Sequence, residues 1–213
     1  MSWELLFFPL EQKPFLDAET YWTRKQRYAL NAHIVYDDLR RILFFQVGWP
    51  GSVFDCTCLS KTSLIKKSEK FFPPREYLIG DSAYILSDKM VVPYKGKKAT
   101  IPENILFNER FSKARVVIEH VMGMLKCRFS SLKGIRSPLA NANGLEKINR
   151  WVVCIMILHN ITLVNNDNWD EEDIDVGNNS NESNYQSIET TSEGERLRSE
   201  VKKHLEIFYD NNY

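Results

Sequence analysis

The stretch YLIGDSAY, residues Tyr77–Tyr84, decides the fold, because three apolar residues run directly into a glycine and an acid. The run Tyr77–Ile79 predicts a short buried strand, and Gly80 ends it. Asp81 then stands at the carboxyl end of that strand. A carboxylate in this place either terminates a strand or helps to hold a metal ion, so the flanking segments must distinguish the two roles.

Three segments upstream of this stretch carry strand signals. They are rich in aromatic and β-branched residues and span Leu5–Leu10, Tyr28–Tyr36 and Arg41–Val47. Asp37 and Asp38 lie between the last two segments, where they predict a hairpin turn. The glycines and proline of GWPGS, residues 48–52, are expected to end the third strand.

Helical periodicity dominates the rest of the body. It predicts one helix over Val53–Lys70 capped by Ser52, and a long helix over Ser112–Phe129 capped by Ser112. A further helix over Asn143–Leu163 is apolar nearly all round at its centre and is therefore expected to be central to the core. Lys89–Gly96 has a loop-like composition. Three strands come first, and a fourth strand and helices follow. This order indicates an α/β fold with a mixed sheet in one domain, residues 1–165.

The composition narrows the class of protein. A chain of 213 residues that is 43% hydrophobic can bury one sizeable core. Its four cysteines form no CxxC pair, which argues against a zinc site or a disulfide framework. The apolar run Trp151–Val164 is short for a membrane span and contains polar residues, and no secretory signal or membrane partner is predicted.

Charge divides the chain into two parts. Residues 1–165 hold 24 Lys+Arg against 15 Asp+Glu, a net charge of +9, whereas residues 166–213 hold 4 against 13, a net charge of −9. The split is typical of a soluble body with an acidic tail. It also suits a body that binds a polyanion while the tail competes for the same surface.

The acidic part has two predicted segments. Residues 166–195, rich in Asn, Ser and acids, predict a disordered linker. Residues 196–213 predict a short amphipathic helix or tail, whose stripe comprises Leu197, Val201, Leu205 and Phe208.

One face of the long helix carries a candidate site. Helical spacing places Glu119 on the same face as Arg115, Gly123 and Lys126. An Arg115–Glu119 pair on a solvated face is one interpretation. The glycine, which costs a helix about 1 kcal/mol relative to alanine, favours the other, in which a metal ion and a phosphate approach this face.

Four motifs in this order and spacing carry a family resemblance. They are GWPGSVFD (Gly48–Asp55), LIGDSAY (Leu78–Tyr84), FNERFSKARVVIEHVMGMLKCRFSSLKGI (Phe107–Ile135) and ILHN (Ile157–Asn160). With the lead-in Pro9–Asp38, the chain resembles the transposase domain of the PIF/Harbinger superfamily over roughly residues 5–163. The resemblance implies an RNase H-like core and an Asp-Asp-Glu triad that binds two divalent cations, magnesium or manganese, and cuts DNA phosphodiester bonds. Asp81 corresponds to the second acid and Glu119 to the third.

The first acid departs from the family pattern. Glu4 stands where the family has the aspartate of an Asp-Gly-Thr motif, and Leu5 and Leu6 follow it. Either sequence upstream is missing or Glu4 replaces the aspartate. Two functions therefore stay open: a metal-dependent nuclease, or an inactive relic or domesticated DNA- or protein-binding module with a broken triad. Asp55 is an accessory metal-ligand candidate, or simply a favourable first-turn charge.

The resemblance also suggests partners. DNA is the expected substrate, a Myb/SANT-like protein a possible DNA-binding partner, and the nucleus the expected location, with the cytoplasm as the alternative. Candidate phosphate contacts are Arg115, Lys126, Lys95, Lys97 and Lys98. His159 and Asn160 are expected to satisfy each other or nearby backbone rather than to catalyse.

Overall fold

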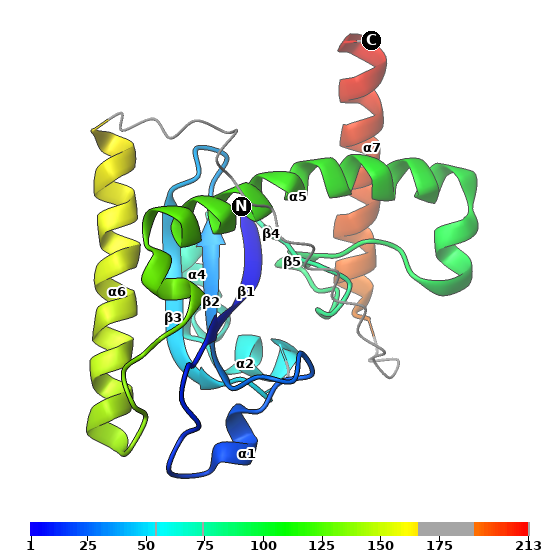
Figure 1. Cartoon of the computed structure of the whole chain (residues 1–213). Coiled ribbons are helices and arrows are strands. Elements are labelled where there is room, and N and C mark those ends of the chain that lie inside the picture. The colour runs from blue at the N-terminus through cyan, green and yellow to red at the C-terminus, as the bar shows by residue number, and fades with distance from the viewer. Residues whose placement is uncertain (54, 74, 166–189, 213) are drawn as a thin grey trace.

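A five-stranded mixed sheet in the order β3-β2-β1-β4-β5 lies at the centre of the molecule, with helices on both faces (Figure 1). The structure is a computed structural model and describes residues 1–53, 55–73, 75–165 and 190–212. At Glu4, residues 55–57, residues 116–119 and residues 210–212 it describes the backbone alone. The prediction of an α/β fold with a mixed sheet flanked by helices is confirmed.

The first three strands form an antiparallel meander. They are β1 (Ser2–Pro9), β2 (Ala29–Tyr36) and β3 (Ile42–Pro50), and β1 pairs with β2 along its whole length. At the predicted turn between β2 and β3, the Asp37 carboxylate accepts hydrogen bonds from the backbone N–H groups of Leu39 (3.0 Å) and Arg41 (2.8 Å). An aspartate that accepts from its own turn explains why the hairpin reverses there.

Strand β3 continues past the point where the sequence predicted its end. Asn31 pairs with Trp49 and Ala32 with Val47, so Gly48 is the extra residue of a bulge. Gly48 has a φ of 94°, a conformation that glycine adopts without strain. The glycine therefore bends the strand rather than stopping it.

The other two strands are short and parallel. They are β4 (Leu78–Ile79) and β5 (Met90–Val91). Met90 and Val91 are almost wholly buried, so their apolar side chains hold a strand inside the segment that was predicted as a loop. Strand β4 joins β1 through a single registered pair, Ser2 with Ile79.

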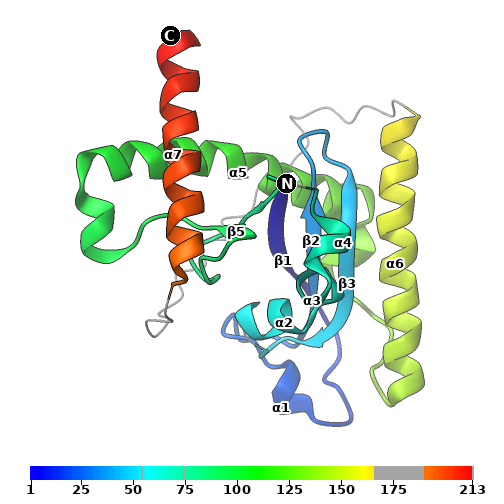
Figure 2. The same cartoon turned by 180° about the vertical axis from the view of Figure 1, so that it is seen from behind.

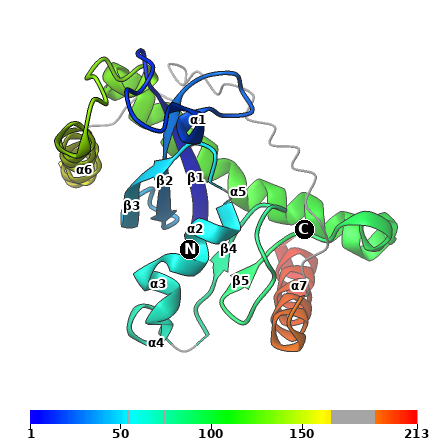
Figure 3. The same ribbon diagram turned by 90° about the horizontal axis from the view of Figure 1, so that it is seen from below.

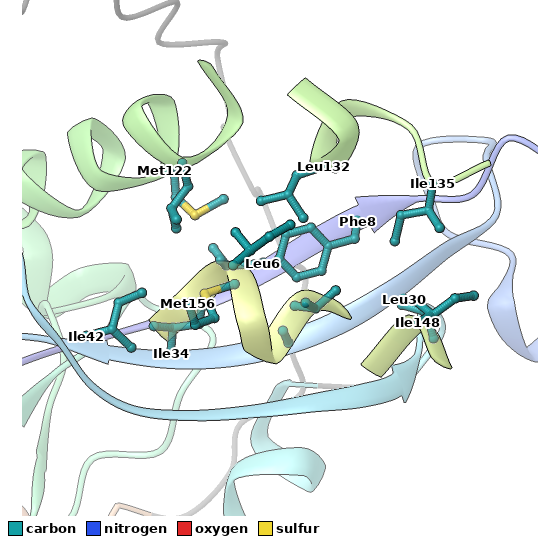
Figure 4. Packing of buried hydrophobic residues seen from close by; sticks show 14 of the residues in the cluster. Leu6, Phe8, Leu30, Ile34, Ile42, Met122, Leu132, Ile135, Ile148 and Met156 are labelled. Atoms are coloured by element: carbon teal, nitrogen blue, oxygen red, sulfur yellow. The ribbon is translucent and has the colours of Figure 1, made fainter. Parts of the chain in front are cut away.

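Two long helices cover one face of the sheet. Helix α5 spans Pro102–Arg128 and begins ten residues before the predicted start, because Pro102 occupies its first turn; Ser112 is an interior residue and not its cap. Helix α6 spans Ala142–Val164, close to the prediction, and the Asn141 side chain caps it by accepting from the Gly144 N–H at 3.0 Å. Together with β1–β3 they enclose the main hydrophobic cluster (Figure 4).

That cluster follows the alternation of the strands. Leu6 and Phe8 of β1 and Leu30 and Ile34 of β2 point into it, where they meet side chains of α5, α6 and the 3₁₀ turn η2 (Ser130–Lys133). The intervening residues face the opposite side. There Trp3 packs in a second cluster with side chains from the segment between β3 and β4.

The segment between β3 and β4 forms three short helices instead of the one predicted (Figure 2). They are α2 (Asp55–Lys61), α3 (Ser63–Lys66) and α4 (Ser68–Phe71). The buried Thr62 hydroxyl donates to the Leu59 carbonyl (2.8 Å) and accepts from the Ile65 N–H (3.3 Å), which ends one helix and starts the next. Ser52 lies three residues before α2 and does not cap it.

Helix α6 lies at the side of the molecule, and the expectation that it would be central to the core is wrong. Its inner face, with Ile148, Val152 and Met156, is buried, whereas Leu158 and Ile161 on its outer face are nearly half exposed. By length and composition alone, it is the one helix in the described part of the chain that could cross a membrane. Its buried face packs on the sheet as a core helix does.

The tail helix docks on the body. Helix α7 (Ser192–Asn212) lies across α5 and against the edge strand β5 (Figures 1 and 3). Val201 is buried with Val91, Phe107 and Phe111 in a third apolar cluster. The predicted helix is confirmed and starts four residues earlier, so residues 192–195 are helical rather than linker. Of the rest of the predicted linker, residues 166–189 lie outside the described residues.

Candidate active site at the end of strand β4

Gly80 carries the chain out of the sheet immediately before Asp81. Its N–H donates to the Val91 carbonyl at 2.9 Å, so the backbone is held against β5. A Cβ at this position would lie 2.8 Å from the Met90 sulfur and 2.9 Å from the Tyr84 ring. Glycine is therefore needed for this close approach, which fixes where the next residue leaves the strand.

Asp81 is partly buried at the carboxyl end of β4. Its Oδ1 accepts a hydrogen bond from the Ala83 N–H at 2.7 Å. Burial raises the pKa of the Asp81 carboxyl, and the Ala83 hydrogen bond and the positive charges of Arg115 and Lys95 oppose the rise. A carboxylate that folding partly desolvates and surrounds with two cations is typical of a functional site.

The sheet register brings position 4 beside Asp81. Strands β1 and β4 are parallel and pair at Ser2 and Ile79. Glu4 lies two residues beyond this pair along β1, and Asp81 lies two residues beyond it along the chain, just past the end of β4. The Ser2–Ile79 pair thus brings the backbones of the first two positions of the implied triad into the same region.

Helix α5 supplies the third position. Arg115 is close enough to lower the pKa of Asp81, and Glu119 lies one helical turn further along the same face. The backbone therefore directs positions 4, 81 and 119 from a central strand, a strand end and a helix towards one region.

Carboxylate oxygens fit a hard divalent cation. Magnesium in proteins is bound through one or two carboxylates together with water and substrate oxygens, and positions 4, 81 and 119 offer only such donors. Among the side chains that the structure describes, no three His, Cys, Asp or Glu residues gather as a metal cluster. The side chains of Glu4 and Glu119 are not among those described, so the fit rests on donor chemistry and on backbone placement.

The residues predicted to contact phosphate have different surroundings in the structure. Lys95 lies within electrostatic range of Asp81, and burial lowers its pKa. Lys97 is exposed in the 3₁₀ turn η1 (Gly96–Thr100). Lys98 Nζ pairs with Glu195 of α7 at 3.0 Å. Asp55 opens α2, and the structure describes its backbone alone.

Lys126 belongs to a cationic cluster that sequence reasoning missed. Burial lowers its pKa, and so do the charges of Lys25, Arg27 and Lys133. These residues come from the segment before β2 and from η2, far apart in the sequence, so no spacing pattern could have joined them. Gly80 was also missed as a site residue, since it was interpreted only as a strand end.

His159 and Asn160 satisfy backbone, as predicted. His159 Nε2 lies 3.0 Å from the Arg40 carbonyl, and burial lowers the pKa of this imidazole. The Asn160 amide accepts from the Ile42 N–H (2.9 Å) and donates to the Ile42 carbonyl (2.8 Å). Both residues of the ILHN motif therefore tie α6 to the start of β3.

Comparison with known families agrees with this geometry. The model of the DDE superfamily endonuclease family matches residues 7–160, most of the chain. The chain belongs to this family. The fold is accordingly the RNase H-like α/β fold that the motifs implied, and a nuclease-family function is supported. The match starts after Glu4 and includes Asp81 and Glu119.

Similar proteins occur in animals and plants. The mouse protein "Putative nuclease HARBI1" is 31% identical over 147 residues, which is 68% of this chain and 40% of the mouse protein. The human protein of the same name is 28% identical over 184 residues, 85% of this chain and 52% of the human protein. "Protein ALP1-like" of Arabidopsis thaliana is 29% identical over 164 residues, 71% of this chain and 38% of the plant protein. The chain thus spans about two fifths to one half of these relatives, and no solved structure matches it.

Proposed function

We propose that the chain is a metal-dependent endonuclease domain that cuts DNA phosphodiester bonds. One observation supports the proposal: the Ser2–Ile79 pair of β1 and β4 lies two residues before both Glu4 and Asp81, and Arg115 of α5, one helical turn before Glu119, lies close enough to Asp81 to lower its pKa. In this proposal the three acidic positions, which come from three elements, together form the metal site.

Each residue has a defined role in this proposal. Asp81, Glu119 and Glu4 would hold the divalent ions, magnesium or manganese, which when bound supply an activated nucleophile and stabilise the leaving oxygen. Arg115 and Lys95 lie near Asp81 and favour its ionised form. The same two cations would attract the scissile phosphate and hold it against the carboxylates.

A second function follows from the residue at position 4. Glutamate is one methylene longer than the aspartate of the family motif, and it is followed by the buried Leu5 and Leu6. Metal-dependent catalysis depends on placing donor oxygens to within about 0.5 Å. A DNA- or partner-binding module with the same fold and no cutting activity is therefore the alternative.

Nicking of supercoiled plasmid distinguishes the two functions. The purified chain with magnesium or manganese is expected to nick the plasmid, and Asp81→Asn and Glu119→Gln are expected to lower the rate by a factor of about 100 or more. Glu4→Asp restores the shorter acid of the family motif and is expected to raise the rate. If wild type, Glu4→Asp and Asp81→Asn give the same metal-dependent background, the nuclease function is wrong for this chain.

Partners and location follow from the same proposal. DNA as substrate implies the nucleus as the place of action, and a Myb/SANT-like protein would supply sequence-specific binding. Immunofluorescence of the tagged full-length protein tests the nuclear location. Co-purification with a Myb/SANT-like protein from nuclear extract tests the partner. Exclusion from the nucleus would contradict the first part.

A further inference from the structure

Four cations gather beyond the candidate active site. Lys25 and Arg27 come from the segment before β2, Lys126 from α5 and Lys133 from η2. The three other charges and partial burial together lower the pKa of Lys126. Lys25 Nζ lies 5.8 Å from the centre of the Phe7 ring, which places the cluster beside β1. Gathering like charges costs free energy, and a bound polyanion would offset that cost.

A cavity adjoins this cluster. It has a volume of about 510 Å³, within the range of ligand sites, and Lys133 lies in its wall. The other polar side chains of the wall match the oxygens of a phosphate chain: Arg136, Ser130, Ser131 and Ser137. Trp151 of α6 also lines the cavity and is 37% exposed. An exposed indole beside cations and hydroxyls is the combination on which unpaired bases stack.

One acid of the cavity wall opposes a phosphate. Glu11 lines the cavity, and its side chain lies directly over the backbone of Gly134. Its negative charge should weaken the binding of an anion. Removing the charge of Glu11 should therefore strengthen DNA binding, whereas removing the charge of a lysine should weaken it.

The cavity lies further from the acids than the cation cluster does. The Leu10–Ile135 bridge and the Glu11 N–H to Ile135 carbonyl bond (3.0 Å) place the cavity wall just beyond the end of β1. Seven residues separate Glu4 from Glu11, which at about 3.3 Å per residue is roughly 23 Å. Duplex DNA rises about 3.4 Å per base pair, so this length is roughly seven base pairs. Figure 1 shows β1 running from beside α5 towards the loops at the opposite end of the sheet.

We propose that the Lys25–Arg27–Lys126–Lys133 cluster and the adjoining cavity form a second DNA-binding surface. Lys126 lies seven residues beyond Glu119 on α5, about 10 Å along the helix, so the cations hold the phosphate backbone roughly three base pairs from the cut bond. The cavity takes one unpaired base, which stacks on Trp151. The inference rests on the proposed function in one respect only, that DNA is the substrate.

Binding without metal tests the surface separately from cutting. Fluorescence anisotropy in EDTA compares a paired 20-base-pair duplex with the same duplex carrying one bulged thymine. For both duplexes, Lys126→Ala/Lys133→Ala is expected to bind about tenfold more weakly, and its slope of log K against log salt should be shallower by about two. Lys113→Ala/Lys203→Ala removes the same charge from exposed positions and should bind as the wild type does. Glu11→Gln should bind more tightly.

The role of Trp151 is tested by the ratio of the affinities for the bulged and the paired duplex, rather than by the affinity for either duplex. The wild type is expected to prefer the bulged duplex by about fivefold or more; Trp151→Ala should lose this preference and Trp151→Phe should keep most of it. Circular dichroism confirms that each variant is folded. Equal binding of the bulged and paired duplexes by the wild type would overturn the base-binding cavity.

The remaining outcomes separate this inference from the nuclease proposal. If Lys126→Ala/Lys133→Ala binds as its control does, the surface is wrong. If thymidine monophosphate displaces the bulged duplex at a concentration equal to that of the duplex, the cavity is a free-nucleotide site, and the DNA surface is overturned. Intact binding with no metal-dependent nicking would overturn the nuclease and leave the surface standing. No binding of the wild type to either duplex would overturn the surface and DNA as substrate together.

Discussion

The two halves of the sheet are built in different ways. Strands β1, β2 and β3 are eight or nine residues long and share a ladder and one apolar cluster. Strands β4 and β5 have two residues each and depend on single contacts, such as Ser2 with Ile79 and the docked helix α7. Asp81 belongs to the short half and Glu4 to the long half. The candidate site therefore lies at the junction between a strongly determined scaffold and a weakly held edge.

The largest effect is expected in the long half. Leu6 is 1% exposed within the main cluster, so Leu6→Ala should lower the free energy of unfolding by about 3 kcal/mol. Urea denaturation should show this as one cooperative transition at a lower midpoint. Leu43→Ala, at a position that is 49% exposed on β3, is the matched control and should stay within about 0.5 kcal/mol of the wild type. Equal midpoints for the two variants would contradict the distinction between the halves.

A smaller and local effect is expected in the short half. Val201→Asp places a charge in the apolar cluster of α7 and β5 and should release the helix. Hydrogen exchange of peptides covering Met90–Val91 and α7 should accelerate by about tenfold or more, while β2 and β3 stay protected. Ile207→Asp adds the same charge at a half-exposed position of α7 and serves as the control. Uniform acceleration throughout the sheet would show that the halves unfold together.

The smallest effect is expected from Asp81→Asn, which should raise the melting temperature of the protein. Because burial raises the pKa of this carboxyl above 3.8, the folded protein holds its proton more tightly than the unfolded chain does. This residue's contribution to stability therefore falls as pH rises from about 3.8 through the folded pKa. Asp81→Asn keeps an acceptor for the Ala83 N–H and removes the buried charge, so its Tm at pH 7 should exceed that of the wild type by a few degrees.

Two controls sharpen this last prediction. The advantage of Asp81→Asn should disappear below pH 3.8, where the carboxyl is protonated in both states. Magnesium should raise the Tm of the wild type and leave that of the variant unchanged, since a ligand that binds the folded state alone stabilises it. A lower Tm for Asp81→Asn at pH 7 would mean that the attraction of Arg115 and Lys95 exceeds the cost of burial.

The sequence predicted the long half of the sheet and the strand end before Asp81 well. Runs of β-branched and aromatic residues located β1, β2 and β3, and the motif LIGDSAY located Asp81 at a strand end. Apolar periodicity also located α6 to within a residue or so at each end. These features are local, so neighbouring residues carry their signal.

Strand β5 and the Lys126 cluster depend on distant contacts, whereas the start of α5 has a local signal that was missed. Strand β5 has two residues and exists because Met90 and Val91 are buried between β4 and α7, which a local pattern does not reveal. Helix α5 begins at Pro102 rather than Ser112, although a proline in a first turn is itself a start signal. The cluster around Lys126 is assembled by tertiary structure from three segments that are far apart in the sequence, so no local pattern predicts it.

The amide of Asn160 affects whether the edge of strand β3 can pair with a second copy of the chain. Strand β3 lies at the outer edge of the sheet, where free N–H and C=O groups invite a strand from another chain. Asn160 takes both backbone groups of Ile42, as one residue of a sixth strand would, and α6 runs alongside β3 (Figure 1). Asn160 thus occupies the backbone groups of Ile42, so this end of the β3 edge is not open to a strand from another chain.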